Sequence, residues 1–322
     1  MTPERLRLVP YHAGMADLWN AFVAESKNGT FLFDRQFMDY HANRFEDASL
    51  VAFEGPGDGR PVAFLPATRE RRAGGDWLIS HAGLSYGGWI TDARMTTPGM
   101  LTLFELLKAW ATQNRIVNLR YKAVPACYHR LPADEDLYAL FVQGAQLVRQ
   151  DLSSVIDLQA PVAWSKGKVQ GLSKAAANGV RVEQSHDLAG FMAMLAPVLA
   201  THGATPTHSL GELTLLAGRF PQSIRLYAAS VGVEAIAYVL VFDTGQTVHT
   251  QYMASSPRGR AIGGLEAIID RLQRHDYAGR RYLSFGISTE TEGRVLNEGL
   301  VRQKEMFGAR AMVCSFYDLP TI

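Results

Sequence analysis

The order of predicted strands and helices in the second half of the chain constrains the fold more than any other feature. Apolar residues recur there at every second position in some segments and at every third or fourth position in others, which predicts strands and helices respectively. The separators 231–233 and 244–245 are short enough for hairpins, so the three strands that they join are expected to be antiparallel. The predicted order is a helix at 165–178, a strand at 180–184, helices at 187–199 and 208–219, strands at 223–230, 234–243 and 246–254, a helix at 259–275, a strand at 281–287, a helix at 292–307 and a closing strand.

Local signals predict where several of these helices begin. Asp187 is expected to cap the helix that follows it, because a carboxylate accepts hydrogen bonds from the first-turn amides. Ser209 and Glu212 have the spacing of a capping box, and Thr289 and Glu292 have the same spacing. These pairs support the starts of the helices expected at 208–219 and 292–307.

The first half of the chain repeats this element order, which indicates an internal duplication. A length of 322 residues suits two domains of roughly 150 residues each. The join is expected at Gln159-Ala160-Pro161, because proline disfavours a continuing regular element there. We therefore expect an α/β protein with α+β mixed sheets, made of two tandem domains at 1–158 and 162–322.

Composition excludes several kinds of protein. The formal net charge of +1 argues against the bulk electrostatic binding of nucleic acid, so no DNA partner is expected. The only two cysteines, Cys127 and Cys314, exclude a disulfide scaffold and a four-cysteine zinc site, and no metal is expected. No segment approaches the ~20 apolar residues of a membrane span, and the N-terminus has no signal-peptide core. A reduced, cytoplasmic protein is expected.

The predicted element order resembles the GNAT (Gcn5-related N-acetyltransferase) fold, and two such units in tandem resemble the FemAB-type transferases. The segment Asn297-Glu298-Gly299-Leu300, with Gln303-Lys304 and Phe307-Gly308-Ala309, is similar to the Gly-Leu…Lys…Phe-Gly run near the end of FemAB-like chains. Three phrases resemble FemAB-like proteins of surface-polysaccharide gene sets: Asn28-Gly29-Thr30-Phe31, His249-Thr250-Gln251-Tyr252 and Phe285-Gly286-Ile287-Ser288. The resemblance covers nearly the whole chain and implies a transferase whose donor side is the second unit.

A glycine-rich turn follows the strand at 246–254, where the GNAT resemblance implies a site for the pyrophosphate of acyl-CoA. A helix N-terminus presents N–H groups and partial positive charge to an anion, and glycines let phosphate approach the backbone. The family pattern is Gln/Arg-x-x-Gly-x-Gly/Ala, and this chain departs from it because Gly264 comes one residue early. The alternative is a Pro-Gly turn that begins an ordinary helix. The implied donor-binding residues are Arg258, Gly259, Arg260, Ala261, Ile262, Gly263 and Gly264.

Three titratable residues are candidates for the chemistry. His249 lies on the strand that corresponds to the fourth GNAT strand, and imidazole titrates near neutral pH, as a general base should. Glu290 follows the fifth strand and is a candidate base or amine-binding carboxylate, while His208 is a candidate for orienting a base or an acceptor. Each has a structural alternative: a hydrogen-bonded histidine on a half-buried face, or a carboxylate at a helix N-terminus.

Further polar residues are candidates for substrate binding. Strand alternation places Gln251 on the same face as His249 and Tyr252 on the opposite face. A structural role at the surface is the alternative for each residue taken singly. The candidates are Gln251, Tyr252, Ser288 and His202 in the second unit, and Asp34, Tyr40, His81 and Lys122 in the first.

The sequence favours an acyl-CoA-dependent N-acyltransferase that acts on the amino group of a small molecule. The resemblance implies an amino sugar or nucleotide sugar of surface polysaccharide biosynthesis as acceptor, and acetyl-CoA or another acyl-CoA as co-substrate. One alternative is a FemAB-like transferase that takes its aminoacyl group from charged tRNA, which a basic stripe of Arg294, Arg302, Lys304 and Arg310 would favour. Another is a non-catalytic ligand-binding protein. The acceptor, the acyl chain length and the oligomeric state stay open.

Overall fold

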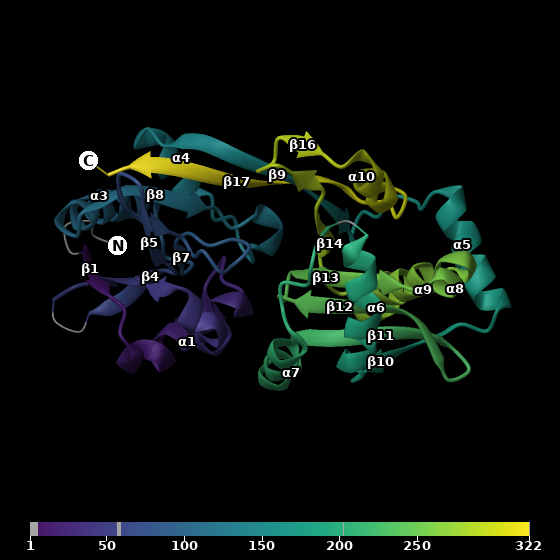
Figure 1. Cartoon of the computed structure of the whole chain (residues 1–322). Coiled ribbons are helices and arrows are strands. Elements are labelled where there is room, and N and C mark those ends of the chain that lie inside the picture. Colours follow the sequence, from purple (N-terminus) through teal and green to yellow (C-terminus); the bar gives the residue numbers. More distant parts are fainter. Residues whose placement is uncertain (1–5, 57–58, 202, 322) are drawn as a thin grey trace. The chain divides into compact units, whose positions relative to one another are not determined.

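The computed structural model describes residues 6–56, 59–201 and 203–321, which form two compact units (Figure 1). Unit 1 contains the chain up to Asp151, the segment Thr291–Arg294 and the chain from Val313 onward. Unit 2 contains Leu152–Glu290 and Val295–Met312. The sequence predicts two domains that are each continuous in the chain, 1–158 and 162–322. In the structure, the closing strand instead contributes most of its residues to unit 1. The reason is that this strand pairs with a strand of the first half, from Phe316↔Lys122 to Pro320↔Asn118.

Unit 1 has two sheets that enclose an apolar core. One sheet has the strand order β1-β3-β4-β7, and the other contains β2, β5, β6, β8 and the end of β17. Helix α3 buries Leu103, Phe104 and Leu107 in the core that these strands form. The elements of unit 1 are β1 (Leu6–Pro10), α1 (Ala16–Glu25), α2 (Arg35–Met38), β2 (Glu46–Asp47), β3 (Leu50–Glu54), β4 (Arg60–Leu65), β5 (Thr68–Arg72), β6 (Gly75–Ile79), β7 (Ile90–Thr91), α3 (Thr97–Gln113), β8 (Ile116–Lys122) and α4 (Glu135–Val142).

Unit 2 has one sheet with the strand order β10-β11-β12-β13-β14-β9, to which β9 contributes its second half. All neighbouring strands are antiparallel except β13 and β14, which are parallel. Figure 1 shows α6 and α9 beside this sheet. The elements of unit 2 are the second half of β9 (Gln146–Asp157), α5 (Lys166–Ala177), β10 (Arg181–Ser185), α6 (Leu188–Ala200), α7 (Leu210–Arg219), β11 (Ile224–Val231), β12 (Glu234–Asp243), β13 (Thr247–Ser255), α8 (Pro257–Ile262), α9 (Gly264–Arg271), β14 (Tyr282–Ile287), β15 (Thr289–Glu290), β16 (Val295–Leu296) and α10 (Glu298–Glu305). The closing strand β17 (Arg310–Pro320) begins in unit 2 and continues into unit 1.

The two faces of the unit 2 sheet pack against different helices. Val239, Val241 and Val248 share one hydrophobic core with Ile268 and Ile269 of α9. On the opposite face the rings of Tyr238 and Tyr252 lie against Phe191 of α6, with ring centroids 6.1 and 6.2 Å apart. The side chains of β12 and β13 therefore alternate between an aliphatic α9 face and an aromatic α6 face.

The local helix signals are borne out in part. Asp187 caps α6 by accepting from Gly190 N at 2.8 Å, and Ser209 and Glu212 form a reciprocal capping box on α7. The capping box expected at Thr289 and Glu292 does not form. Helix α10 instead begins after Asn297, whose side chain accepts from Leu300 N at 3.0 Å. Thr291 and Glu292 have positive φ angles of 49° and 52°, which cannot continue into a helix.

The expected helix at 259–275 is broken into two helices at Gly263. That residue has a φ of 83° and ends α8 in the left-handed conformation, and α9 begins at Gly264. Glycine adopts this conformation without a Cβ penalty, so the break is built into the sequence.

A β-bulge in β13 changes which residues share a face. Leu240 of β12 pairs with Tyr252 and Val241 pairs with Thr250, so Gln251 is the extra residue of the bulge. Phe242 pairs with His249, and Leu240 and Phe242 point to the same face. His249 therefore shares its face with Tyr252. The expectation that Tyr252 lies opposite His249 is wrong, because simple alternation does not account for the inserted residue.

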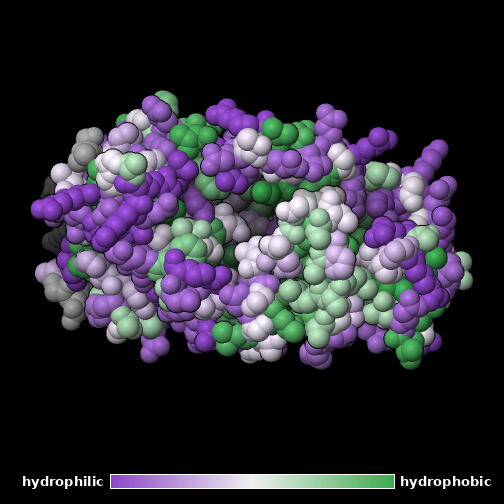
Figure 2. All heavy atoms as spheres, viewed as in Figure 1, coloured by the Kyte–Doolittle hydropathy of each residue, from purple (hydrophilic) through white to green (hydrophobic). Residues whose placement is uncertain are grey.

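The exposed surface of α6 is apolar and uncharged. Its sequence, LAGFMAMLAPVLA, has no charged residue, and the view in Figure 2 shows pale hydrophobic colouring over this helix. Within the residues that the structure describes, no helix is both long and apolar enough to span a bilayer.

Candidate functional site

The strands β13 and β14 run side by side for only a short distance before they part. Their parallel register covers Thr247↔Tyr282, Val248↔Leu283 and His249↔Ser284, and in the described chain no further pair continues it. On the other side of β14 the register with β9 also shifts between Ser284 and Ile287. A gap between the two parallel strands therefore begins at His249, and beyond it this edge of β13 has no strand partner among the described residues.

The imidazole of His249 is held from β14. Its Nδ1 lies 3.2 Å from Ser284 Oγ, and that hydroxyl also accepts a hydrogen bond from Gly286 N at 3.2 Å. Gly286 has a φ of 72°, and a Cβ on it would lie 3.0 Å from His249 Cε1. Both features require glycine at this position, because a side chain would be strained and would press on the imidazole.

Lys304 is buried behind the end of β14. Its ammonium donates to Gly286 O at 2.9 Å, to Ile287 O at 2.7 Å and to Ser288 Oγ at 2.8 Å. Burial lowers the pKa of Lys304 to about 8, so it remains mostly protonated at neutral pH. This lysine fixes the carbonyls of β14 at the point where the strand leaves β13.

His249 is neutral at physiological pH, and its pKa lies below the near-neutral value expected from the sequence. Burial, with a further contribution from the positive charge of Lys304, lowers the pKa of this imidazole to about 4. A neutral imidazole has one nitrogen lone pair free to accept a proton. If Nδ1–H donates to Ser284 Oγ, that lone pair is on Nε2.

His208 and Tyr252 form a second polar contact on the face that carries His249. His208 Nδ1 lies 2.9 Å from the Tyr252 hydroxyl, which also accepts from Thr207 N at 3.1 Å. His208 is 6% exposed. The contact joins the start of α7 to β13, so the structure gives His208 and Tyr252 a role in fixing the α6–α7 connection.

A cavity of about 1250 Å³ lies in unit 2 beside the start of α8. Its walls come from α6, the end of β13, α8, α9 and the segment 290–303. Of the predicted residues, Gly259, Arg260 and Glu290 line it, whereas His249, His208 and Tyr252 do not. Glu290 is exposed and accepts from Asn297 Nδ2 at 2.8 Å. The cavity is therefore the place where the predicted donor turn and one predicted carboxylate meet.

The cations around the predicted donor turn already have partners. Arg258 forms an ion pair with Glu234, and Arg260 Nη1 donates to Ser255 O at 2.7 Å. The first turn of α8 is capped by Ser256, whose Oγ accepts from Gly259 N at 3.0 Å. The turn thus supplies fewer free donors to an anion than its sequence suggests.

At the glycines of the same turn, other atoms of the protein come so close that a Cβ would have no room. A Cβ on Gly259 would collide with Ile236 O, and a Cβ on Gly263 would collide with Gly171 O of α5. A Cβ on Gly264 would lie 3.0 Å from Ala237 Cβ. Packing of α8 and α9 against β12 and α5 accounts for these glycines without a bound phosphate.

The remaining candidates of unit 2 have mixed environments. Ser288 is buried and accepts from Lys304, while Gln251 is the half-buried residue of the β13 bulge. Ala261 and Ile262 lie in α8. His202 lies outside the described residues. The assignment of all these residues to a substrate or donor stays a prediction.

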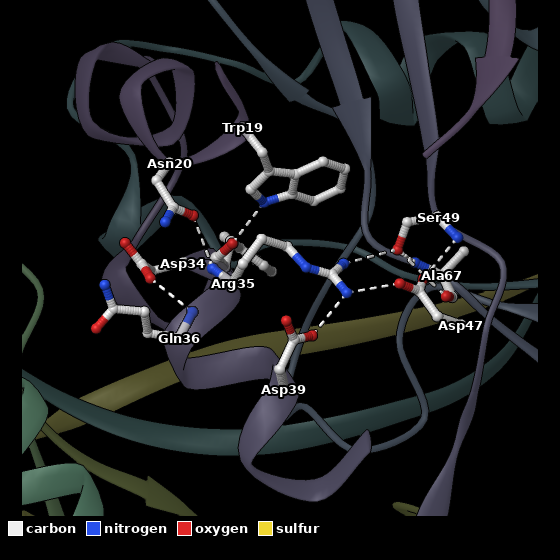
Figure 3. A network of polar contacts seen from close by, with 10 residues as sticks. Trp19, Asn20, Asp34, Arg35, Gln36, Asp39, Asp47, Ser49 and Ala67 are labelled. Atoms are coloured by element: carbon white, nitrogen blue, oxygen red, sulfur yellow. Dashed lines mark hydrogen bonds and ion pairs between the residues drawn. The ribbon is translucent and has the colours of Figure 1, made fainter. Parts of the chain in front are cut away.

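In unit 1, a network of polar contacts is centred on Arg35, and Asp34 is the predicted substrate residue that Figure 3 shows beside it. The Arg35 guanidinium donates to Asp39 at 2.6 Å and to Asp47 at 2.5 Å. Asp34 caps α2 by accepting from Gln36 N at 2.8 Å. Both observations give these groups structural roles.

A second cavity, of about 610 Å³, lies beside this network and is lined by Arg35, Asp47 and His81, among others. Burial lowers the pKa of His81 to about 3, so this imidazole is neutral. Lys122 is buried and donates to His81 O at 2.8 Å and to Leu84 O. Tyr40 packs against His41, with ring centroids 4.2 Å apart. Of the four predicted residues of unit 1, His81 alone lines this cavity.

Sequence reasoning did not single out Ser284, whose hydroxyl contacts the imidazole of His249, and it did not predict the burial of Lys304. Lys304 was one of four residues whose basic stripe would favour the tRNA-dependent alternative, but it is 3% exposed and its ammonium has three acceptors. Its place in the Gly-Leu…Lys…Phe-Gly run was the signal that could have found it. No group of three or more His, Cys, Asp or Glu residues within the described ranges is arranged to hold a metal ion.

Comparisons with known proteins find the fold but no close relative. No family model matches the sequence, and no curated protein matches it. Among solved structures, FemX superposes with a TM-score of 0.70 at 11% identity, covering 98% of this chain and 97% of FemX. L-PGS from Bacillus licheniformis gives a TM-score of 0.58 at 11% identity, with 95% and 91% of the two chains covered. A tandem GNAT protein from the clavulanic acid biosynthesis pathway gives 0.50 at 12% identity, with 98% and 99% covered.

The chain has the FemAB-like tandem GNAT fold. This agrees with the fold class and the family resemblance expected from the sequence. In this chain, unit 2 contains the parallel strands β13 and β14, which separate beyond His249. The likeness to FemX, at 11% identity, concerns the fold alone.

Proposed function

We propose that this protein is an N-acyltransferase that moves an acyl group from an acyl thioester to the amino group of a small molecule. The observation that carries the proposal is the gap between β13 and β14, which begins at a neutral, half-buried imidazole. The free backbone edge of β13 beyond His249 suits an extended chain with amide groups, which is the chemistry of the pantetheine arm of acyl-CoA. The adjoining cavity has room for such an arm.

His249 is the general base in this proposal. The amine nitrogen attacks the thioester carbonyl carbon, the C–N bond forms, and the C–S bond breaks with its electron pair leaving on sulfur. His249 Nε2 takes the proton that the amine loses, provided that Nδ1–H donates to Ser284 Oγ. The protein's own contribution is to hold this nitrogen in one orientation and to bring the two reactants together.

Glu290 is proposed to attract the protonated form of the acceptor amine. Its carboxylate is exposed at the wall of the cavity and is oriented by Asn297. A titratable group therefore lines the cavity, which argues against the alternative of a non-catalytic double-GNAT protein. The acceptor class that the sequence resemblance implies, an amino sugar or nucleotide sugar of surface polysaccharide, is retained as part of the proposal.

One observation favours the second candidate, an aminoacyl transfer from charged tRNA of the kind that the FemAB resemblance implies. The cations of the predicted pyrophosphate turn are engaged by Glu234 and by Ser255 O rather than left for phosphate. A second observation opposes it, because Lys304 is buried and cannot join a basic stripe on the surface. The acyl thioester donor is therefore preferred.

The test is to mix the protein with acetyl-CoA and a panel of amines that includes glucosamine and a UDP-linked amino sugar. Free thiol release is followed in time, and mass spectrometry identifies the acetylated amine. The proposal predicts release that depends on both partners. Thiol release that is the same without amine, together with amide formation only from aminoacyl-tRNA, would overturn it in favour of the second candidate.

A further inference from the structure

Helix α4 of unit 1 is apolar on both of its faces. Its inner face carries Ala139 and Leu140, which are fully buried in the core of unit 1. Its outer face carries Tyr138, Phe141 and Val142, which are 53%, 80% and 50% exposed. A helix at the surface of a protein normally has a polar outer face, and a helix that is hydrophobic all round is normally buried. The outer face of α4 is therefore expected to be covered by a partner.

The three exposed side chains form one continuous strip. Residues three and four positions apart are neighbours on a helix surface, so Phe141 and Val142 both adjoin Tyr138. A single exposed apolar side chain is ordinary, whereas aromatic side chains that gather on one strip are typical of protein interfaces. We call Tyr138, Phe141 and Val142 the α4 strip.

The α4 strip has an exposed carboxylate at its N-terminal end. Asp134 directly precedes α4, four positions before Tyr138, and its side chain is 62% exposed. Its carboxylate lies 3.9 Å from Nδ1 of His129. Burial lowers the pKa of this histidine, so the imidazole is neutral at physiological pH and does not balance the charge of Asp134.

The other end of the α4 strip has a cation beside it. Gln143 directly follows α4, and its Oε1 accepts a hydrogen bond from Lys108 Nζ of α3 at 3.3 Å. The amide of Gln143 is neutral, so this contact does not balance the charge of the ammonium. The strip therefore has a carboxylate at one end and an ammonium at the other.

We propose that the α4 strip is the interface of a homodimer in which α4 of one copy packs antiparallel against α4 of a second copy. A two-fold axis through the middle of the strip then brings Asp134 of each copy to Lys108 of the other. A parallel arrangement would instead bring the two Asp134 carboxylates together, and like charges that meet in an interface cost free energy. The charges at the ends of the strip thus fit a second copy of this chain and fix its direction.

A lipid surface is the alternative cover for an apolar helix, and the charges of α4 disfavour it. Helices that lie on membranes carry Lys and Arg beside their apolar face, because these residues bind anionic lipids. Helix α4 has no cation, and its first turn carries Glu135 and Asp136 directly after Asp134. A second copy of the chain is therefore the preferred partner.

Sedimentation equilibrium of the full chain tests the dimer. The measurement covers protein concentrations of about 1–100 µM, where a dimer of micromolar affinity dissociates. We expect the wild type to change from monomer to dimer in this range, and Phe141→Asp to weaken the dimer by about thirtyfold or more, as expected for an interface hot spot. The control is Val233→Asp in unit 2, at a fully exposed valine outside the strip, and it should dimerise like the wild type.

A charge exchange tests the antiparallel arrangement through surface changes alone. Asp134 makes no side-chain cap bond, so Asp134→Lys leaves the helix start without a lost hydrogen bond. Asp134→Lys and Lys108→Glu should each weaken the dimer by about threefold to tenfold, and the double variant should recover most of that loss.

Three results would overturn the proposal: a wild type that stays monomeric at about 100 µM, a dimer that Phe141→Asp leaves intact, or a double variant no better than the single ones. Binding to phosphatidylglycerol vesicles by a monomeric wild type, lost in Phe141→Asp, would assign the α4 strip to a membrane instead.

Discussion

Gly286 lies against the imidazole of His249, so that a Cβ on this glycine would be 3.0 Å from His249 Cε1. The same glycine has a φ of 72°, and its N–H donates to the hydroxyl of Ser284, the residue next to Nδ1 of His249. Gly286 therefore determines how much room the His249 imidazole has and, through Ser284, how this proposed base is oriented.

Gly286→Ala should lower turnover more than its loss of stability explains. The matched control is Gly245→Ala, because Gly245 also has a positive φ of 92° but has no neighbour within 4 Å of the new Cβ. Both variants should lose about 1 kcal/mol of unfolding free energy from backbone strain. Only Gly286→Ala should reduce kcat, by about tenfold or more. Equal kcat values for the two variants would contradict the positioning role of Gly286.

Lys304→Met should move the acidic limb of the pH–rate profile to higher pH. The base must be neutral to accept a proton, so activity falls as pH drops through the pKa of His249, which is about 4 in the wild type. Removing the positive charge of Lys304 removes one cause of this low pKa, and the pKa of His249 should rise. The measurement is kcat/KM against pH. Lys304→Arg, which keeps the charge, should leave the limb near its wild-type position, and an unchanged limb in Lys304→Met would contradict the electrostatic coupling.

Gly263→Ala should destabilise unit 2 strongly, because α5 lies against this glycine. Gly179→Ala is the control, since Gly179 has a φ of 67° with open space around it. The control should lose about 1 kcal/mol, and Gly263→Ala should lose roughly 1–3 kcal/mol more from the collision with Gly171 O. Urea denaturation measures both. Similar losses would mean that α5 does not depend on this glycine, and the packing explanation of the turn would fail.

Asp136 should make unit 1 less stable as pH rises from about 4 to 7. Burial raises the pKa of this carboxyl from 3.8 to about 7, and Tyr121 OH donates to it at 2.6 Å. In this pH window the folded chain keeps a proton that the unfolded chain releases, so stability falls with rising pH. Asp136→Asn should flatten that part of the stability curve, as followed by thermal unfolding. An identical slope in wild type and variant would show that another group is responsible.

Signals that act within a few residues were predictable from the sequence. Asp187 and Ser209 cap their helices as expected, because each side chain accepts a hydrogen bond from the amide three positions further along the chain. The hairpins that join β11, β12 and β13 were predictable for the same reason. The overall element order, and hence the fold, follows from such local signals.

Features that depend on distant partners were not predictable in this way. The bulge at Gln251 becomes visible only in the pairing of β13 with β12, and it reverses the face of Tyr252. The glycines at 259 and 263 looked like a phosphate cradle because Ile236 and Gly171, which fill the space beside them, are far away in sequence. Lys304 looked exposed because a sequence does not reveal three acceptors at the end of another strand.

The most direct test of the account is the turnover of His249→Ala, measured as thiol release from acetyl-CoA with the best amine of the panel, together with the dissociation constant for CoA. His275→Ala, at an exposed histidine of the same unit, is the control. Loss of a general base should lower kcat by about 10²–10⁴-fold. The dissociation constant should change by less than about threefold, and the control should behave as wild type. Near wild-type turnover in His249→Ala, or a loss fully explained by weaker CoA binding, would contradict the claim that acyl transfer occurs where β13 and β14 part.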